Sequence, residues 1–281
     1  MITLTNVTQI RLIPRFGWID DLPDIGKKDL SLAKDSKLLV LGGAVQNEMD
    51  VSSFYRPISD QLSFPSCTAN AAVDAGESQV IIGKIDDGMT LSQAVSTTPD
   101  LSRMFAWFNG RQLIDPPQGY NASSGCYNRL ILDGMLRHGI CTEVRWPYIA
   151  DNAAHRPSLM SYREAFAHTY AAFYSIKETG NDRLQLILQA LAARHSIIFG
   201  TDVDEAFMAY KSGIAHKPST PIVGRHALVI VGWSQAKSAF KVRNSWSKYW
   251  GDQGYVWMHT DYIIDYSGTK SFWVLTKGAL A

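Results

Sequence analysis

The sequence predicts an α+β protein in which a helix-rich first half is followed by a strand-rich second half. Between Ser66 and about residue 195, apolar residues recur at helical spacing. Beyond that point lie short β-branched or aromatic runs separated by Gly, Ser, Lys and Asp, a pattern typical of strands and turns. The sequence contains no internal repeat or heptad array. We therefore expect two segregated halves, and a cleft between them is the default location for a functional site.

Four helices are predicted. The first begins around Ser66, whose hydroxyl suits an N-cap, and continues through small and apolar residues from Cys67 to Gly83. The other three cover residues 101–111, 127–139 and 182–195. Gly139 is expected to end the third, because glycine readily adopts the conformation that stops a helix. The polar, turn-rich residues 85–103 and 115–125 are predicted as loops.

Four strands are predicted after the last helix, over residues 196–203, 226–233, 239–246 and 255–260. The first 49 residues have a different character. They combine two short β-like runs, at 2–7 and 37–45, with the turn-rich stretch 17–30. We interpret residues 1–49 as an N-terminal extension with little core of its own, and residues 50–281 as the main domain.

Composition and charge exclude several classes of protein. The 281 residues carry a formal net charge of +1, with 46% hydrophobic and 19% charged residues, as in ordinary globular proteins. Neither a nucleic acid nor a membrane is therefore an expected partner, and we expect a monomer. The first residues lack an apolar stretch followed by a small-residue cleavage site, so no secretory signal is predicted. Localisation stays open between the cytoplasm and export by a non-classical route.

The cysteines direct attention to thiol chemistry. The chain has three, Cys67, Cys126 and Cys141, and an odd, small number argues against a disulfide framework. No pair has the CxxC spacing of a structural zinc site, and the seven histidines are scattered, so neither a metal nor a cofactor is expected. One thiol is therefore a candidate nucleophile.

Cys67 is that candidate because it begins a predicted helix, and a helix N-terminus lowers the pKa of a thiol. His226 is a candidate base, and Asn244 a candidate for orienting its ring. The backbone N–H of Cys67 and the side-chain amide of Gln61 are candidate oxyanion donors. Taken singly, each has an ordinary alternative: a small core residue for the cysteine, a core or surface group for the histidine, and a turn residue for the asparagine.

The order and context of these residues are more specific. The segments DQLSFPSCTANA, GRHALVIVGW and KVRNSWSKYWGDQGYVWM resemble the papain family of cysteine peptidases. Gln61 lies six residues before Cys67, as the family's oxyanion glutamine lies before its nucleophile. The family's Asn-Ser-Trp-Gly-x-x-Trp-Gly-x-x-Gly-Tyr block matches residues 244–255 at all but one position, where Ser247 replaces a glycine. Residues 101–111 look like the bacterial and viral branch of the family.

The resemblance implies a papain-like fold with a helical N-terminal half, an antiparallel β-barrel-like C-terminal half and the active-site cleft between them. It implies a cysteine-type endopeptidase that hydrolyses peptides or proteins through an acyl-enzyme, with Gln61, Cys67, His226 and Asn244 as its catalytic residues. The family's Gly-Gly-Tyr platform, whose backbone pairs with an extended peptide, corresponds to Gly125-Cys126-Tyr127. The residues expected to contact substrate are Gly125, Cys126, Tyr127, Asn128, Ala227 and Trp246.

Two other functions stay open at this point. One is acyl transfer or isopeptide cleavage, which differs only in the nucleophile that accepts the acyl group. The other is an inactive binding protein that keeps the fold, although intact Cys67, His226, Asn244 and Gln61 argue against it.

The N-terminal extension also has two interpretations. Trp18 is a possible aromatic anchor, and Pro14 and Pro23 favour an extended run suited to a groove. As in many papain-like zymogens, the stretch is expected either to cross and block the cleft or to pack permanently on the body.

Overall fold

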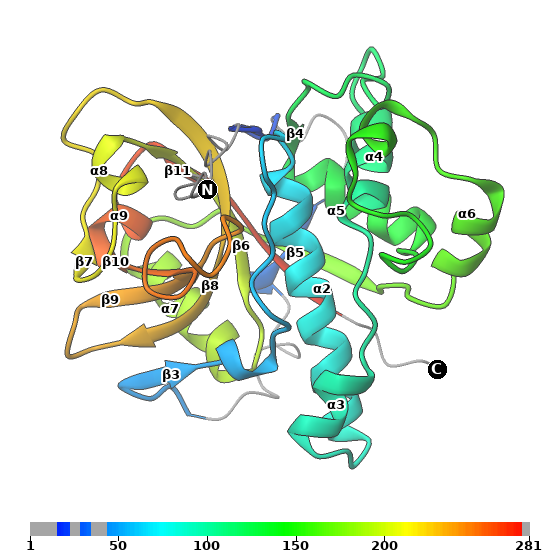
Figure 1. The fold of residues 1–281 in the computed structure, drawn as a ribbon. Coiled ribbons are helices and arrows are strands. Elements are labelled where there is room, and N and C mark those ends of the chain that lie inside the picture. The colour runs from blue at the N-terminus through cyan, green and yellow to red at the C-terminus, as the bar shows by residue number, and fades with distance from the viewer. Residues whose placement is uncertain (1–15, 23–28, 35–43, 277–281) are drawn as a thin grey trace, which may run out of the picture.

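The computed structural model describes residues 16–22, 29–34 and 44–276. Figure 1 shows a group of helices on one side of the molecule and most of the strands on the other, with α2 (Cys67–Asp86) between them. The α+β arrangement with segregated halves is therefore confirmed.

The central element is α2 (Cys67–Asp86), which starts at the predicted residue. Its buried residues run without interruption from Cys67 to Ile82, so it has no solvent-facing side over that length. Small side chains such as Ala69, Ala72 and Ala75 allow neighbouring elements to approach it closely. Because α2 is enclosed on all sides, the position of its first residue is fixed by packing of both halves.

Further helices surround α2 and the sheet. They are α3 (Leu91–Thr97), α4 (Arg103–Gln112), α5 (Asn128–His138), α6 (Leu159–Ala165), α7 (Gly180–Ala192), α8 (Glu205–Met208) and α9 (Thr260–Ile264), with 3-10 turns at Leu32–Lys34, Ser52–Phe54 and Ala150–Ala154. Gly139 follows α5 with φ 67°, as expected for its end.

One loop prediction was wrong. Residues 85–103 contain α3, which begins with a capping box in which Thr90 and Gln93 bond each other's backbone N–H groups. The helix is polar on its exposed positions and short, so its composition resembled that of a loop.

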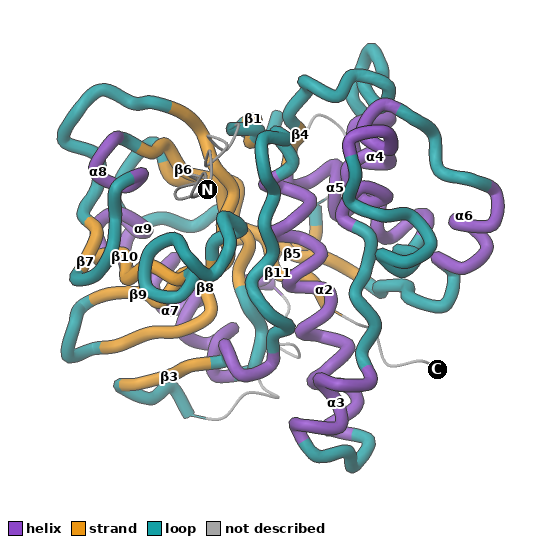
Figure 2. Tube along the Cα trace, in the orientation of Figure 1, coloured by secondary structure: helices purple, strands orange, loops and turns teal. Residues whose placement is uncertain are grey.

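The main sheet comprises, within the described residues, nine strands. In spatial order they are β2 (Leu30–Ser31), β5 (Ala172–Ile176), β11 (Thr269–Thr276), β6 (Ile197–Val203), β8 (Gly224–Ser234), β9 (Ala239–Arg243), β10 (Tyr255–His259) and β7 (Ile214–Ala215), and β3 (Glu48–Asp50) also pairs with β8. Most pairs are antiparallel, but β2–β5 and β10–β7 are parallel. Figure 2 traces these strands in orange. Among the described residues, the strand order ends at β2 on one side and at β7 on the other, and these two strands do not pair. The expected β-barrel-like half is therefore an open sheet and not a closed barrel.

The described part of the N-terminal extension packs on the rest of the chain. Strand β1 (Trp18–Ile19) pairs in parallel with β4 (Cys126–Tyr127), while β2 adds to β5 and β3 to β8. Leu32 is fully buried. The run at 2–7, most of the run at 37–45, Pro14 and Pro23 lie outside the described residues. A boundary at residue 49 would divide β3, so this strand is structurally part of the main body.

A buried ionic cluster joins the two halves near α2. Asp74, on the second turn after Cys67, binds Arg243 of β9 at 2.7 Å and Arg103 of α4 at 2.7 Å. Arg103 also binds Glu77 at 3.3 Å. Removing one partner of such a cluster leaves a buried charge uncompensated, which typically costs about 3–5 kcal/mol. The cluster therefore fixes α2 against both walls of the cleft.

Within the described residues, no helix has the length and apolar character needed to cross a bilayer.

Candidate active site

Cys67 lies at the N-terminus of α2 and is fully buried. Backbone N–H groups of Ala227, Gly17 and Thr68 form hydrogen bonds to its sulfur. Ala227 directly follows His226 on β8. The helix start thus lies close to the strand that carries the predicted base, across the boundary between the two halves.

His226 and Asn244 come from neighbouring antiparallel strands. Residue 226 opens the buried part of β8, and Asn244 directly follows β9. The Nε2 atom of His226 lies 2.7 Å from Oδ1 of Asn244. A carboxamide oxygen only accepts hydrogen bonds, so Nε2 carries the hydrogen and Nδ1 keeps its lone pair. Nδ1 is buried and has no hydrogen-bond partner in the described residues, which leaves it available to a thiol proton.

Trp246 covers this pair. Its ring is stacked on the His226 imidazole, with centroids 4.4 Å apart and planes 27° apart, and only 4% of Trp246 is exposed. The indole therefore excludes water from the His226–Asn244 hydrogen bond, which strengthens that bond.

Gln61 is fully buried next to the same loop. Its Oε1 accepts a hydrogen bond from Ser245 Oγ at 2.8 Å, and its Nε2 donates to the carbonyl of Phe64 at 2.9 Å. These contacts fix which end of the amide is the donor. The amide nitrogen is the end of the side chain that an oxyanion acceptor requires.

Both titratable members of the pair are neutral in this structure. Burial raises the pKa of the Cys67 thiol to about 11, although the surrounding backbone N–H groups lower it. Burial lowers the pKa of His226 to about 4, against the hydrogen bond to Asn244, which raises it. The expectation of a low thiol pKa therefore does not describe this buried form, because loss of hydration outweighs the helix terminus and the hydrogen bonds.

Of the predicted substrate-contacting residues, Ala227 contacts Cys67 directly through its backbone N–H. Gly125, Cys126 and Tyr127 form the edge at β4, and Ala227 and Trp246 lie beside His226. Asn128 is fully buried and donates to the carbonyl of Ser271 at 3.3 Å. Its side chain therefore stabilises the packing behind the cleft and is not exposed to a substrate. All three cysteines are buried and free.

Residues 16–22, called here the cleft segment, lie across this site. The carbonyl of Gly17 accepts a 2.8 Å hydrogen bond from the N–H of Cys126, and the N–H of Gly17 bonds the Cys67 sulfur. The ring of Phe16 meets the rings of His226 and Trp246 edge-on, with centroids 6.4 and 6.3 Å away. The cleft segment therefore covers the nucleophile, the base and the peptide-pairing edge together.

Glycines that the sequence analysis did not single out make room for this segment. A Cβ at Gly17 would lie 2.0 Å from the carbonyl oxygen of Pro65, and one at Gly224 would lie 2.0 Å from the Phe16 ring. A Cβ at Gly200 would lie 1.9 Å from the Trp18 indole. An isolated glycine inside a strand pattern, such as Gly200 in IIFGTDV, is a sequence signal for close approach of another chain segment.

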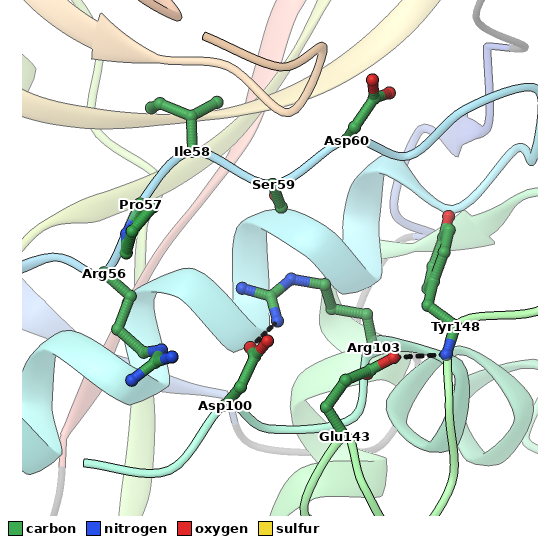
Figure 3. A pocket seen from close by; sticks show the side chains of 9 residues that line it. All are labelled: Arg56, Pro57, Ile58, Ser59, Asp60, Asp100, Arg103, Glu143 and Tyr148. Carbon is green, nitrogen blue, oxygen red and sulfur yellow. Dashed lines mark hydrogen bonds and ion pairs between the residues drawn. The ribbon is translucent and has the colours of Figure 1, made fainter. Parts of the chain in front are cut away.

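A cavity lies next to the loop that carries Gln61. Figure 3 shows this cavity of about 270 Å³, lined by Arg56, Pro57, Ile58, Ser59, Asp60, Asp100, Arg103, Glu143 and Tyr148. Tyr148 connects it to the site, because its hydroxyl donates to the carbonyl of Gln61 at 3.0 Å and contacts Ser66 Oγ. None of the predicted catalytic residues lines this cavity. Through Tyr148, its lining stabilises the loop that carries Gln61.

The structure also brings together two of the histidines that are scattered in the sequence. Among the described residues, the ligand-type atoms of His216, His259 and Asp261 lie within 4.8 Å of one another, where the end of β7 meets the end of β10. Imidazole and carboxylate groups suit a divalent transition metal. This cluster shares no residue with the Cys67 site.

A family model described as papain family cysteine protease matches residues 45–272. An uncharacterized peptidase C1-like protein of Acanthamoeba polyphaga mimivirus is 28% identical over 285 residues, covering 93% of this chain and 86% of that protein. Pro-cathepsin H of Mus musculus is 28% identical over 208 residues, covering 71% of this chain and 55% of that protein. The chain thus spans most of the viral protein but about half of this cathepsin.

Solved structures are similar over nearly the whole chain. Xylellain, a cysteine protease from Xylella fastidiosa, matches with a TM-score of 0.76 at 24% identity, covering 98% of this chain and 100% of that one. ProCathepsin B S9 from Trypanosoma congolense matches with a TM-score of 0.67 at 15% identity, covering 95% and 87%. The fold implied by the sequence resemblance is thereby confirmed.

Proposed function

The chain belongs to the papain family of cysteine proteases, and we propose that it is an active cysteine endopeptidase that uses Cys67, His226, Asn244 and Gln61. The observation that carries this proposal is the 2.7 Å contact between His226 Nε2 and Asn244 Oδ1. It leaves Nδ1 without a hydrogen-bond partner among the described residues, one position along β8 from Ala227, whose backbone N–H bonds the Cys67 sulfur. An inactive binding protein has no need for this alignment.

The proposed reaction begins when a substrate occupies the cleft in place of residues 16–22. His226 Nδ1 takes the thiol proton, and the Cys67 thiolate attacks the carbonyl carbon of the scissile peptide bond. The Cys67 backbone N–H and Gln61 Nε2 donate to the oxyanion. The imidazolium then protonates the leaving amine, so the C–N bond breaks and a thioester remains.

Deacylation uses the same groups. His226 Nδ1 takes a proton from water, and the resulting hydroxide attacks the thioester carbonyl, releasing a carboxylic acid and the thiol. Asn244 keeps the imidazole plane aligned in both half-reactions, and Trp246 keeps water from competing for their hydrogen bond.

We further propose that the N-terminal extension makes the described form latent. The cleft segment runs parallel to β4 and presents an N–H, not a carbonyl carbon, to the Cys67 sulfur. A thiolate cannot attack an N–H, so the segment occupies the site without being a substrate. This arrangement favours the interpretation in which the cleft segment blocks the active site. It disfavours the alternative in which the segment only packs on the body and does not affect activity.

The function is tested with the full chain and a library of unlabelled peptides, scored by mass spectrometry. We expect new peptide termini with the wild type and none with Cys67→Ala, whose fold is verified by circular dichroism. Adding a primary amine separates hydrolysis from acyl transfer, because a transferase would give the amide product in place of the acid. Equal cleavage by wild type and Cys67→Ala would refute the assignment.

A further inference from the structure

Three potential metal ligands meet at the edge of the main sheet. Among the described residues, His216, His259 and Asp261 form a group whose ligand-type atoms, one from each residue, all lie within 4.8 Å of one another. Two of the three side chains are imidazoles and only one is a carboxylate, so the group is not a simple concentration of negative charge. Imidazole nitrogens together with a carboxylate oxygen are a typical ligand set for zinc and related transition metals.

The register of two strands brings the histidines together. Strand β7 pairs in parallel with β10, with Ala215 opposite Met258. The next pair in this register is His216 and His259, and partners in a ladder project their side chains to the same face. Their imidazole rings accordingly lie with centroids 4.9 Å apart and planes 33° apart. The two backbones therefore hold the imidazoles as neighbours, although they are far apart in the sequence.

The third ligand comes from the helix that follows β10. Asp261 lies in the first turn of α9, and its Oδ1 lies 2.5 Å from Nδ1 of His259. Burial raises the pKa of Asp261, but the neighbouring cationic groups, above all His259, lower it below its usual value. The carboxylate is therefore ionised at neutral pH, and the hydrogen in the short contact is carried by Nδ1. Moving this hydrogen to Nε2 gives the other neutral tautomer, which frees the Nδ1 lone pair beside a carboxylate that is already charged.

A helix cap explains only part of this group. His259 is the N-cap of α9, and its Nδ1 lies 3.4 Å from the backbone N–H of Asp261. Capping and a hydrogen bond between the two side chains account for the positions of His259 and Asp261. Neither interaction involves His216, which is exposed to solvent. The second imidazole is therefore the feature that distinguishes a metal site from a helix cap.

A tetrahedral zinc ion fits among the three side chains. Zinc binds imidazole nitrogen and carboxylate oxygen at about 2.0–2.2 Å, which places two ligands of one ion about 3.3 Å apart. The three side chains are exposed or partly exposed, so small rotations bring their ligand atoms to this spacing. Their exposure also leaves the fourth position open to water. Magnesium and calcium prefer six or more oxygen ligands and do not suit this group.

The nearest positive charge belongs to a side chain that can move away. Nζ of Lys217 lies 4.0 Å from Oδ2 of Asp261, and 53% of the lysine side chain is exposed. The ammonium group balances the charge of the carboxylate and competes with a metal ion for it. Because Lys217 reaches into solvent, it does not close the site.

We propose that His216, His259 and Asp261 bind one divalent transition-metal ion, with zinc as the best fit, and that this ion cross-links the end of β7 to the start of α9. Residues 216–223 connect β7 to β8, the strand that carries His226, so the ion stabilises the entry to that strand. The site is independent of the proposed peptidase function, because it shares no residue with the Cys67 site and requires no turnover.

The test measures Zn²⁺ binding to the untagged full chain carrying Cys67→Ala, which removes a thiol that could itself bind zinc near His226. Affinity and stoichiometry are obtained by titration calorimetry and by competition with a fluorescent chelator. We expect one zinc ion per chain and no saturable binding of Mg²⁺ or Ca²⁺ at the same concentrations. The melting temperature should rise with added Zn²⁺, because the folded chain alone presents the three ligands together.

Variants that remove one ligand identify the site. His216→Ala should weaken zinc binding by at least about 100-fold, since even residues that only support metal ligands contribute about 10–100-fold. His259→Asn should have the same effect while keeping the helix cap, because asparagine is among the best N-cap residues. Asp261→Asn should weaken binding by at least about tenfold. Circular dichroism verifies that each variant folds.

Two further variants provide a control and a change in the opposite direction. His155→Ala removes an exposed histidine outside the group and should leave the affinity unchanged. Lys217→Ala removes the competing ammonium group and should tighten zinc binding. One zinc site that persists at full affinity in His216→Ala would overturn the proposal, as would equal binding of Zn²⁺ and Mg²⁺. A melting temperature of His259→Asn that rises with Zn²⁺ as much as that of the parent chain would overturn it as well.

Discussion

The N–H of Cys126 donates a 2.8 Å hydrogen bond to the carbonyl of Gly17. This bond occupies the edge that the resemblance assigns to an extended peptide, and it does so next to the nucleophile. A substrate therefore competes with a tethered segment of the same chain, whose effective concentration is high because it does not have to diffuse to the site. Activity of the full chain depends on the balance between the two.

Gly17→Ala should shift that balance toward the open form. Its Cβ would lie 2.0 Å from the Pro65 carbonyl oxygen, a backbone atom that cannot move aside cheaply. We expect kcat/KM of the full chain on a good peptide to rise by about tenfold or more. Trp18→Ala should raise it as well, because burial of the indole contributes up to a few kcal/mol to docking.

Leu22→Ala is the matched control in the same segment, because Leu22 is 68% exposed and little is lost on its truncation. Turnover that is identical in wild type, Gly17→Ala and Trp18→Ala would show that these residues pack on the body without blocking it.

The reactivity of Cys67 should change with the same substitution. In the closed form, burial raises the pKa of Cys67 to about 11 and lowers that of His226 to about 4, so neither group is charged at pH 6. Opening the cleft restores hydration, and the helix terminus and imidazole then favour the thiolate. We expect iodoacetamide at pH 6 to alkylate Cys67 much faster in Gly17→Ala than in the wild type.

Mass spectrometry of the labelled peptides provides the internal control. Burial raises the pKa values of Cys126 and Cys141, so both should stay unreactive at pH 6 in either protein. If Cys67 of the Gly17→Ala variant reacts no faster than these two, the ion-pair mechanism is wrong.

Asn244→Ala should reduce activity less than His226→Ala. Both are compared in the Gly17→Ala background, where turnover is highest. Loss of the proton-transfer group should cost about 10²–10⁴-fold in kcat/KM. Asn244 only orients the ring and raises the pKa of His226, so its removal should cost less and move the alkaline limb of the pH–rate profile to lower pH. An unchanged profile with unchanged kcat would exclude Asn244 from the site.

Gln61→Ala should lower kcat by about 10²–10³-fold with little change in KM, the usual cost of losing one oxyanion donor. Ser245→Ala tests how the amide is positioned, because Ser245 Oγ donates to Gln61 Oε1 at 2.8 Å. It should lower kcat to a smaller extent. A loss confined to KM in Gln61→Ala would instead identify Gln61 as a substrate-binding residue.

The sequence signals that define the candidate site are local. The start of α2 was predicted at the correct residue, although the Ser66 hydroxyl makes no capping hydrogen bond and contacts the Tyr148 hydroxyl instead. The Asn244 block is long enough to be specific. The pairing of Gly17 with Cys126 was not predictable in this way. It joins segments more than 100 residues apart, and a two-residue strand such as β1 has no periodicity to detect.

The sign of the Cys67 pKa shift also depended on tertiary structure. A helix terminus and a neighbouring imidazole are visible in the sequence, and both lower a thiol pKa. The opposing effect comes from burial beneath the cleft segment, which only the folded arrangement reveals. Likewise, a glycine inside a strand such as Gly200 signals a close approach in the sequence, but only the structure shows that Trp18 makes it.

Docking of the cleft segment should depend on pH through Asp21. Its carboxylate accepts hydrogen bonds from Trp273 Nε1 at 2.7 Å and from the Arg129 backbone N–H at 3.2 Å. Burial nevertheless raises the pKa of Asp21 to about 6, and these hydrogen bonds only partly oppose it. A free aspartate titrates near 4, so the docked form binds the proton more tightly than the undocked form. This contribution to docking is complete below about pH 4 and is lost as the pH rises through about 6.

The measurable quantity is the ratio of kcat/KM in Gly17→Ala to that in the wild type, measured also in the Asp21→Asn background, because docking shifts the pKa values of Cys67 and His226 equally in both backgrounds. We expect this ratio to be larger at pH 5 than at pH 7, because the closed form is favoured in acid. Asp21→Asn cannot ionise and should flatten the dependence. Asp20→Asn is the control: Asp20 pairs with Lys270 at 2.9 Å on a more exposed surface, so its loss should weaken docking at pH 5 and pH 7 alike. A ratio that rises from pH 5 to pH 7 would mean that acid opens the cleft, and that the charge on Asp21 stabilises docking instead of opposing it.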